Sequence, residues 1–113
     1  MKTRLPRKSE KIRPVLENFK KELHKIYAGN LKQTILFGSY ARGNFHSESD
    51  IDLLVVLDEM ENPYKEIDRI SDIKFEFLLK YDVIITCLFS DKIKLAKKTE
   101  PVFNNIQNEG III

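Results

Sequence analysis

Two short polar groups interrupt the apolar segments of this chain, and their residue types suit phosphate and metal chemistry. Gly38 and Ser39 follow one apolar run, and ten residues later Asp50 and Asp52 open a second. Because side chains alternate along a strand, the two aspartates are expected to project from one face. Paired carboxylates repel each other unless a cation lies between them, and Mg²⁺ prefers such oxygen ligands. The spacing therefore predicts a magnesium site at the start of the second run.

Gly38 and Ser39 are expected to hold phosphate beside that metal. Glycine lets the backbone approach a ligand closely, and exposed N–H groups in such a turn attract anions. A short helix over residues 39–42 would aim its N-terminus at the bound phosphates. A phosphate site next to paired carboxylates indicates metal-assisted phosphoryl or nucleotidyl transfer. The alternative is a polar hairpin loop with two solvent-facing aspartates. Such a loop would not require the two carboxylates to alternate at the start of a strongly apolar strand.

The pattern Gly38-Ser39, ten residues, Asp50-x-Asp52 resembles the motif of the minimal nucleotidyltransferases, a family of the DNA polymerase beta superfamily. The similarity includes Arg42 in the loop and Ser49 before the first aspartate, and it extends along most of the chain to Gly110. The resemblance implies that the aspartates hold two Mg²⁺ ions. It also implies that the triphosphate of ATP or another nucleotide lies on the Gly-Ser pair.

The family takes a third carboxylate from a later strand beside the Asp-x-Asp strand. Asp82 opens the apolar run 82–88 and is its only acidic residue. The resemblance therefore implies that Asp82 is a third metal ligand and accepts the proton of the attacking hydroxyl. The alternative is a turn residue that follows Tyr81.

Three further polar residues of the loop have expected roles. Arg42 is expected to balance charge on the phosphates, unless it is a surface arginine. Ser49 is expected to orient the loop or Asp50 by hydrogen bonding rather than to react. His46 is expected to face solvent, and the alternative is contact with the nucleotide or the acceptor.

Apolar periodicity predicts an α/β fold, with a small, mixed, twisted sheet and packed helices in the order α-β-α-β-α-β-α. Ser9 is expected to cap the first helix, and Asn62 with Pro63 to begin the third. That third helix is expected to turn Tyr64 and Ile67 inward. The expected strands are 33–37, 51–57 and 82–88, and the expected helices lie within 9–29, 39–42, 63–79, 90–98 and 101–110.

The composition fits one compact domain over residues 1–113. The net charge of +2 does not indicate direct binding of nucleic acid. Cys87 is the single cysteine, so no internal disulfide forms, and no apolar run is long enough to span a membrane. These features favour a cytoplasmic protein without a membrane contact.

The resemblance also suggests a partner. Minimal nucleotidyltransferases pair with HEPN proteins as toxin–antitoxin modules, in which the antitoxin transfers AMP to a tyrosine of the RNase toxin. The basic residues 1–11 and Ile111–Ile113 are candidate contacts, because three isoleucines are costly in water. The three terminal isoleucines could instead add a strand, and oligomerisation is left open.

Two other function classes are compatible with the motif. One is nucleotidylation of a small molecule such as an antibiotic, which would need a pocket that this short chain is not expected to build alone. The other is a non-catalytic module that blocks a toxin sterically, against which the intact set of motif residues argues.

Overall fold

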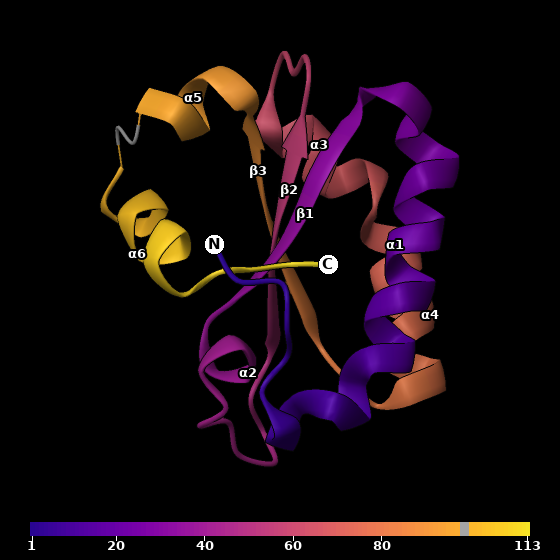
Figure 1. The fold of residues 1–113 in the computed structure, drawn as a ribbon. Helices are drawn as coiled ribbons and strands as arrows, with labels where there is room; N and C mark the ends of the chain where they lie inside the picture. Colours follow the sequence, from indigo (N-terminus) through magenta and orange to yellow (C-terminus); the bar gives the residue numbers. More distant parts are fainter. Residues whose placement is uncertain (98–99) are drawn as a thin grey trace.

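A computed structural model describes residues 1–97 and 100–113 of the chain. Its centre is a twisted four-stranded sheet in the order β3-β2-β1-β4 (Figure 1). β1 runs antiparallel to β2 and β4, whereas β2 and β3 are parallel. The expected small mixed sheet is therefore confirmed, with one strand more than predicted. The strands are β1 Leu31–Phe37, β2 Ile51–Leu57, β3 Ile85–Asp91 and β4 Ile111–Ile112.

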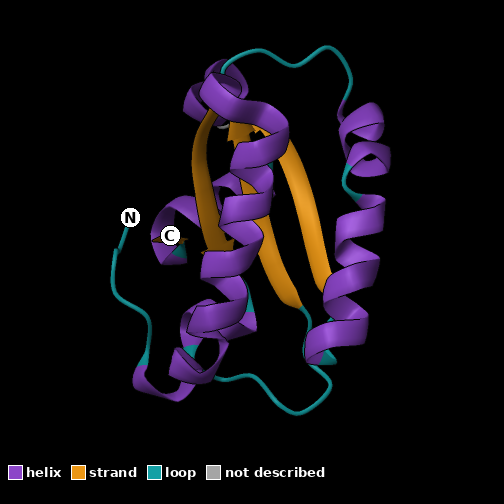
Figure 2. Cartoon of the chain, turned by 90° about the vertical axis from the view of Figure 1, so that its right-hand side faces the viewer, coloured by secondary structure: helices purple, strands orange, loops and turns teal. Residues whose placement is uncertain are grey.

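Helices cover both faces of the sheet, with α1 and α4 on one side and α5 and α6 on the other (Figures 1 and 2). Short helices complete the two ends of the molecule. The α-helices are α1 Arg13–Tyr27, α2 Ser39–Arg42, α3 Pro63–Arg69, α4 Ser71–Tyr81, α5 Lys92–Lys97 and α6 Pro101–Glu109, and the 3-10 helices are η1 Arg7–Ile12 and η2 Ala28–Asn30. None of the described helices is long and apolar enough to cross a membrane.

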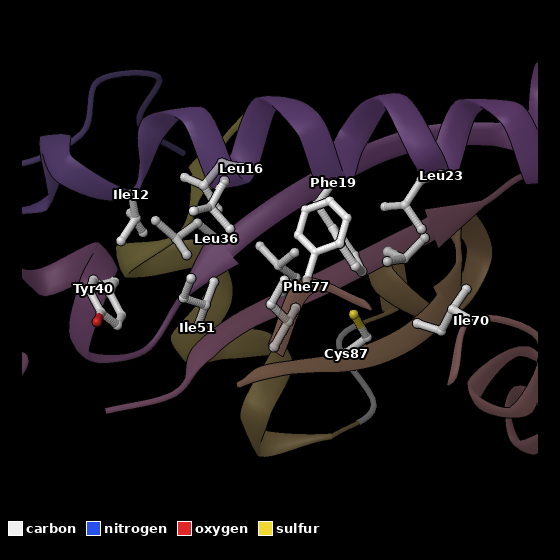
Figure 3. Close-up of a cluster of buried hydrophobic side chains, with 14 of the residues drawn as sticks. Ile12, Leu16, Phe19, Leu23, Leu36, Tyr40, Ile51, Ile70, Phe77 and Cys87 are labelled. Carbon is white, nitrogen blue, oxygen red and sulfur yellow. The ribbon is translucent and has the colours of Figure 1, made fainter. Parts of the chain in front are cut away.

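Strand β2 is buried on both faces, which explains why its sequence is almost continuously apolar. Leu53 and the alternate residues on its face belong to the larger core, under α1 and α4 (Figure 3). The rings of Phe19 and Phe77 meet there edge to face at 5.1 Å. Leu54 and Val56 point to the opposite face and join a second core with α5 and α6. Each fully buried side chain of this size contributes about 1.5–3 kcal/mol, so β2 is the anchor of the fold.

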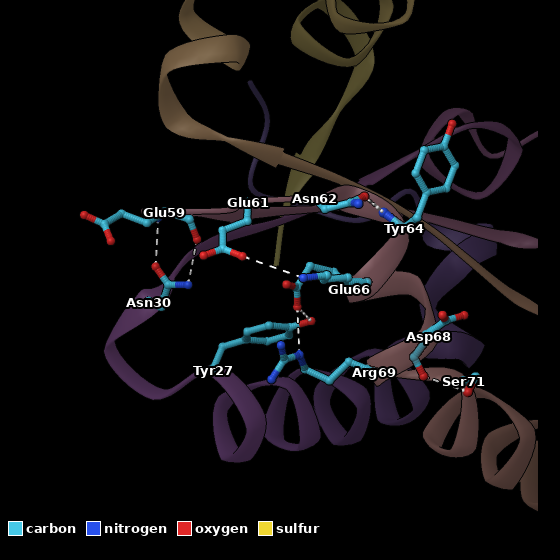
Figure 4. A network of polar contacts seen from close by, with 11 residues as sticks. Tyr27, Asn30, Glu59, Glu61, Asn62, Tyr64, Glu66, Asp68, Arg69 and Ser71 are labelled. Atoms are coloured by element: carbon cyan, nitrogen blue, oxygen red, sulfur yellow. Dashed lines mark hydrogen bonds and ion pairs between the residues drawn. The ribbon is translucent and has the colours of Figure 1, made fainter.

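A polar network fixes α3 to α1 at the end of the sheet far from α2 (Figures 1 and 4). The Tyr27 hydroxyl donates to Oε1 of the buried Glu66 at 2.8 Å, and Nε of Arg69 lies 3.0 Å from the same oxygen. Burial and the Glu66 carboxylate raise the pKa of Tyr27 well above its usual value. Because the buried carboxylate has both a hydroxyl and a guanidinium partner, its desolvation is offset.

The predicted start of α3 is confirmed, but the predicted single helix is wrong. The side chain of Asn62 accepts a hydrogen bond from the Tyr64 N–H at 2.9 Å, and Pro63 is the first helical residue. The helix breaks at Ile70, which is fully buried between α3 and α4. The break rotates the first segment, so that Tyr64 is 76% exposed and Ile67 is exposed as well.

The third strand begins at Ile85, so the prediction that Asp82 opens it is wrong. α4 continues to Tyr81, and Asp82 is its C-cap residue in the left-handed conformation, with φ 55° and its N–H donating to the Leu78 carbonyl at 3.0 Å. Aspartate tolerates this conformation better than most residues. Asp82 is therefore the turn residue that the alternative interpretation described.

Both ends of the chain join the sheet. Ile112 pairs with Ile35 of β1, and Ile111 is almost completely buried. The terminal strand is thus confirmed, and burial makes Ile111 unsuited to a partner contact. Lys2 forms a bridge with Ile111, and Leu5 is buried, so the first residues are not a free arm.

The predicted capping of the last helices is confirmed only in part. Oδ1 of Asp91 accepts from the Lys94 N–H at 2.8 Å at the start of α5. Lys98, where this helix was expected to end, lies outside the described residues. α6 begins at Pro101 and ends before Gly110 as predicted.

Candidate active site

The motif residues meet at the end of the sheet that carries α2 (Figure 1). Asp52 lies between Phe37, its antiparallel partner at the end of β1, and Thr86, its parallel partner near the start of β3. Because β2 starts where β1 ends, the Gly38 turn and the aspartate pair come together. The strand 51–57 and the helix 39–42 that position these residues are confirmed at the predicted bounds.

Gly38 is required by two features of its surroundings. Its φ is 75°, and a Cβ built there would overlap Oδ2 of Asp52 and lie 3.1 Å from the carboxylate carbon. Its carbonyl accepts hydrogen bonds from the N–H groups of Ala41 and Arg42, both at 3.1 Å, which closes α2. Gly43 ends the helix with φ 80°. The turn therefore brings bare backbone against the Asp52 carboxylate.

The two aspartates share one face of β2 but differ in environment. Asp50 is exposed, and its Oδ2 lies 3.4 Å from the Thr86 hydroxyl. Asp52 is half-buried, and burial followed by the charge of Asp50 raises the pKa of its carboxyl above the usual value. The Arg42 guanidinium counteracts part of this rise. The site thus holds a carboxylate whose negative charge is costly without a further cation.

The side chain of Arg42 forms an ion pair with Glu109 of α6. Its Nη1 lies 2.9 Å from Oε1 of Glu109, and both side chains are partly exposed. Such a surface pair contributes at most about 1 kcal/mol, so a bound phosphate can compete for the guanidinium. The structure therefore leaves both predicted roles of Arg42 available.

A cavity of about 490 Å³ opens beside the aspartates. Ser49 shapes its rim, because its hydroxyl accepts from the His46 N–H at 2.9 Å and its own N–H donates to the His46 carbonyl at 3.0 Å. Ser49 thus makes hydrogen bonds within the loop, and His46 is exposed as expected. The cavity is lined by Ser39, Arg42, Asn44, His46, Glu48, Ser49, Asp50 and Asp52.

Sequence reasoning missed the residues that hold α2 in place. Ser9 does not cap a helix; it is buried in η1 and its hydroxyl donates to the Tyr40 carbonyl at 2.6 Å. The Tyr40 ring stacks on Phe45 at 4.2 Å, and Nζ of Lys11 lies 4.8 Å from the Phe45 centroid. The contact between Ser9 and Tyr40 joins residues 31 positions apart, so no pattern of neighbouring residues in the sequence predicts it.

The sequence model of the nucleotidyltransferase domain family matches residues 16–112, which is most of the chain. The chain belongs to this family. The predicted resemblance to minimal nucleotidyltransferases is confirmed, and the protein is a nucleotidyltransferase.

Curated relatives from Methanocaldococcus jannaschii cover nearly the same length. The "Putative protein adenylyltransferase MJ0141" is 39% identical over 97 residues, which is 86% of this chain and 93% of that protein. The "Putative protein adenylyltransferase MJ0604" is 36% identical over 99 residues, or 87% of this chain and 93% of that protein. Both identities, each over more than four fifths of this chain, support membership of the same family.

A solved toxin–antitoxin structure with AMP-PNP has the same fold. It superposes with a TM-score of 0.58 and 21% identity, and covers 85% of this chain and 70% of that chain. At this identity the likeness concerns the fold alone.

The residues of this nucleotidyltransferase suit a magnesium ion bound together with a nucleotide. Mg²⁺ is commonly held by one or two carboxylates plus substrate phosphates rather than by a full protein cage. Asp50 and Asp52 supply the carboxylates, and the raised pKa of the Asp52 carboxyl indicates that Arg42 offsets only part of the cost of its charge. Within residues 1–97 and 100–113, no group of three or more His, Cys, Asp or Glu side chains could hold a metal.

Asp82 is therefore not brought into a three-carboxylate group with the aspartate pair. The neighbouring position on β3, opposite Asp52, belongs to Thr86. The implied metal role of Asp82 depended on its place in the third strand, and that support is lost. Thr86 has no carboxylate, so its residue type gave no signal of a place beside the aspartates.

Thr86→Val should lower transfer about three- to tenfold and leave binding of AMP-PNP nearly unchanged. The substitution keeps the side-chain shape and removes the hydroxyl next to Asp50, a hydrogen bond worth about 0.5–1.5 kcal/mol. Steady-state transfer rates and calorimetric titration would measure the two effects. An unchanged rate would mean that the hydroxyl does not orient Asp50.

Proposed function

We propose that this nucleotidyltransferase transfers AMP from ATP to a tyrosine hydroxyl of a HEPN-family toxin and thereby neutralises it. The observation that carries the proposal is the convergence of the Gly38 turn with Asp50 and Asp52 beside an open cavity. That arrangement suits a triphosphate and its cation on one side and an acceptor hydroxyl on the other.

Each residue of the motif has a defined part in this reaction. The backbone at Gly38 and Ser39 holds the triphosphate, since glycine permits close approach. Asp50 and Asp52 would hold Mg²⁺, which supplies charge stabilisation for the phosphates and the leaving group. Arg42 exchanges Glu109 for a phosphate oxygen, a bond that is stronger because both partners are charged.

The chemical step is an in-line displacement at the α-phosphorus. The acceptor oxygen forms a bond to that phosphorus as the bond to the pyrophosphate oxygen breaks, and pyrophosphate leaves. The hydroxyl proton is lost to solvent through the open side of the site. The residues of the chain contribute mainly by positioning the nucleotide and balancing its charge.

A protein acceptor fits the site better than a small molecule. Asp50 is exposed and the described residues place no lid over it, whereas small substrates are usually enclosed over most of their surface. The names of the two M. jannaschii relatives also indicate protein adenylyltransferases. The toxin–antitoxin partner of the solved neighbour supports a toxin as the acceptor.

Incubation with ATP, Mg²⁺ and a purified HEPN-family protein from the same organism tests the proposal. The acceptor mass should rise by one AMP per transfer, and the rise should disappear on addition of EDTA or in the Asp50→Asn/Asp52→Asn variant. Tandem mass spectrometry should place the group on a tyrosine. Neutralisation of the toxin by that double variant, without any mass change, would instead support steric blocking.

A control reaction separates the small-molecule alternative. Aminoglycosides replace the protein acceptor under the same conditions, and no modified drug is expected. Rapid modification of a drug together with none of the protein would overturn the proposal.

A further inference from the structure

One arginine borders two neighbouring cavities. The cavity of about 490 Å³ beside the aspartates and a second cavity of about 390 Å³ have one described lining residue in common, Arg42. The second cavity is lined by the first residues of the chain, by α2 and by the end of α6. Its other charged lining residues are Lys2, Arg4 and Glu109, so it has three basic groups and one acidic group. Arg42 therefore stands between the candidate nucleotide site and a second, mainly basic cavity.

The partner of Arg42 belongs to the second cavity alone. Nη1 of Arg42 donates to Oε1 of Glu109 at 2.9 Å, and Glu109 lines the second cavity but not the one beside the aspartates. A carboxylate and a phosphate offer a guanidinium the same kind of charged oxygen acceptor. Glu109 thus occupies a donor of Arg42 that a phosphate oxygen of the nucleotide would otherwise take.

The backbone that carries Glu109 is firmly held. Ile106, three residues earlier in α6, is fully buried against the sheet. The Gly110 N–H donates to the Ile106 carbonyl at 2.7 Å, and the Gly110 carbonyl accepts from the Lys2 N–H at 3.1 Å. Because the end of α6 is anchored in this way, the release of Arg42 needs a rotation of side chains and no shift of the helix.

The second cavity also holds cations that can replace Arg42 as partners of Glu109. Lys2 and Arg4 line this cavity, and neither forms an ion pair within the part of the chain that the structure describes. Both residues are exposed, so their long side chains are free to turn towards the carboxylate. An exchange of partners therefore leaves Glu109 among basic groups, which keeps the cost of releasing Arg42 small.

We propose that Glu109 is a positioning residue that holds Arg42 in the nucleotide-free protein, competes with the phosphates for it and so sets the affinity for the nucleotide. The inference rests on the nucleotide site of the proposed function. When ATP binds, Arg42 passes from Glu109 to a phosphate oxygen, and Lys2 or Arg4 pairs with the released carboxylate. Glu109 is thereby a competitor of the nucleotide within the chain itself.

Glu109→Gln should tighten the binding of AMP-PNP with Mg²⁺ about two- to fivefold, the range that corresponds to loss of a partly exposed ion pair. Glu109→Asp keeps the charge and should bind like the wild type. Calorimetric titration measures the affinities. Glu22→Gln is the matched control, because it breaks the ion pair of Glu22 with Lys25 in α1, on the other side of the sheet (Figure 1). The Glu22 side chain is 34% exposed and that of Glu109 is 29% exposed, so the two pairs are comparable.

A double-mutant cycle tests whether Glu109 acts through Arg42. Arg42→Gln should weaken AMP-PNP binding, and the further change Glu109→Gln should then have no effect, because no guanidinium is left to hold. Lys2→Gln/Arg4→Gln should weaken binding only while Glu109 is present.

The inference is overturned if Glu109→Gln binds AMP-PNP like the wild type or more weakly, or if Glu22→Gln gives the same gain. It is also overturned if the gain persists in the Arg42→Gln chain, which would mean that Glu109 repels the phosphates directly. Tighter binding of AMP-PNP by Glu109→Gln, with no transfer to the acceptor by any variant, would count against the proposed function and leave this role of Glu109 standing.

Discussion

Asp52→Asn is expected to abolish nucleotidyl transfer and, at the same time, to make the ligand-free protein more stable. Transfer should fall at least about a hundredfold, or about 2.7 kcal/mol in the barrier, because the variant lacks a carboxylate for the metal. Stability should rise because burial and the charge of Asp50 disfavour the ionised Asp52 side chain in the folded state. Asparagine fills the same space without that charge.

The pH dependence of the stability difference follows from the direction of the pKa shift. The pKa of Asp52 in the folded protein is above its ordinary value of 3.8, so the unfolded state loses this proton more readily. Below 3.8 both states are protonated and the penalty is absent; it develops as the pH rises from 3.8 towards the folded-state pKa, and it is complete above that pKa. The Asn variant should therefore have a higher melting temperature than the wild type at pH 7, and the gain should shrink towards acid pH.

Thermal unfolding with and without Mg²⁺ and AMP-PNP separates the two roles of the carboxylate. Ligand should raise the melting temperature of the wild type and have little effect on the variant, because binding to the folded state adds to stability. A lower melting temperature of Asp52→Asn in the absence of ligand would show that Asp52 supports the fold itself.

The parts of the site that the sequence predicted are those with local signals. Gly38, the helix 39–42 and the strand that starts at Ile51 are defined by residues close to one another in the chain. The same holds for Asn62, whose side chain bonds to a backbone group two residues away.

The missed parts depend on contacts between distant segments. Val83 and Ile84 continue the β-branched pattern of the strand, so Asp82 resembles a strand residue although it terminates a helix. Only the parallel register of β2 and β3 reveals that Thr86 lies opposite Asp52. The position of Asp82 relative to the active site thus depends on where α4 ends, and the local composition of the sequence does not determine that end.

Gly38→Val is expected to eliminate binding of the triphosphate and to destabilise the fold. The backbone at this position has φ 75°, a conformation that a β-branched residue adopts only with strain. Its Cβ would also overlap Oδ2 of Asp52, so the carboxylate or the turn must move. Strain of this kind costs about 1–3 kcal/mol, and the phosphate cradle loses its shape. Calorimetric titration with AMP-PNP and thermal unfolding measure the two losses.

A matched set of variants assigns the loss to this contact. Gly29→Ala should be harmless, because nothing lies within 4 Å of a Cβ at Gly29. Gly38→Ala should retain much of the stability loss, and Asp52→Ala in the same chain should recover part of it by removing the overlapping carboxylate. Stability changes that simply add in this cycle would mean that the two residues do not interact. AMP-PNP affinity equal to the wild type in Gly38→Val would show that the phosphates bind elsewhere, because the turn could not keep its present form around a valine side chain.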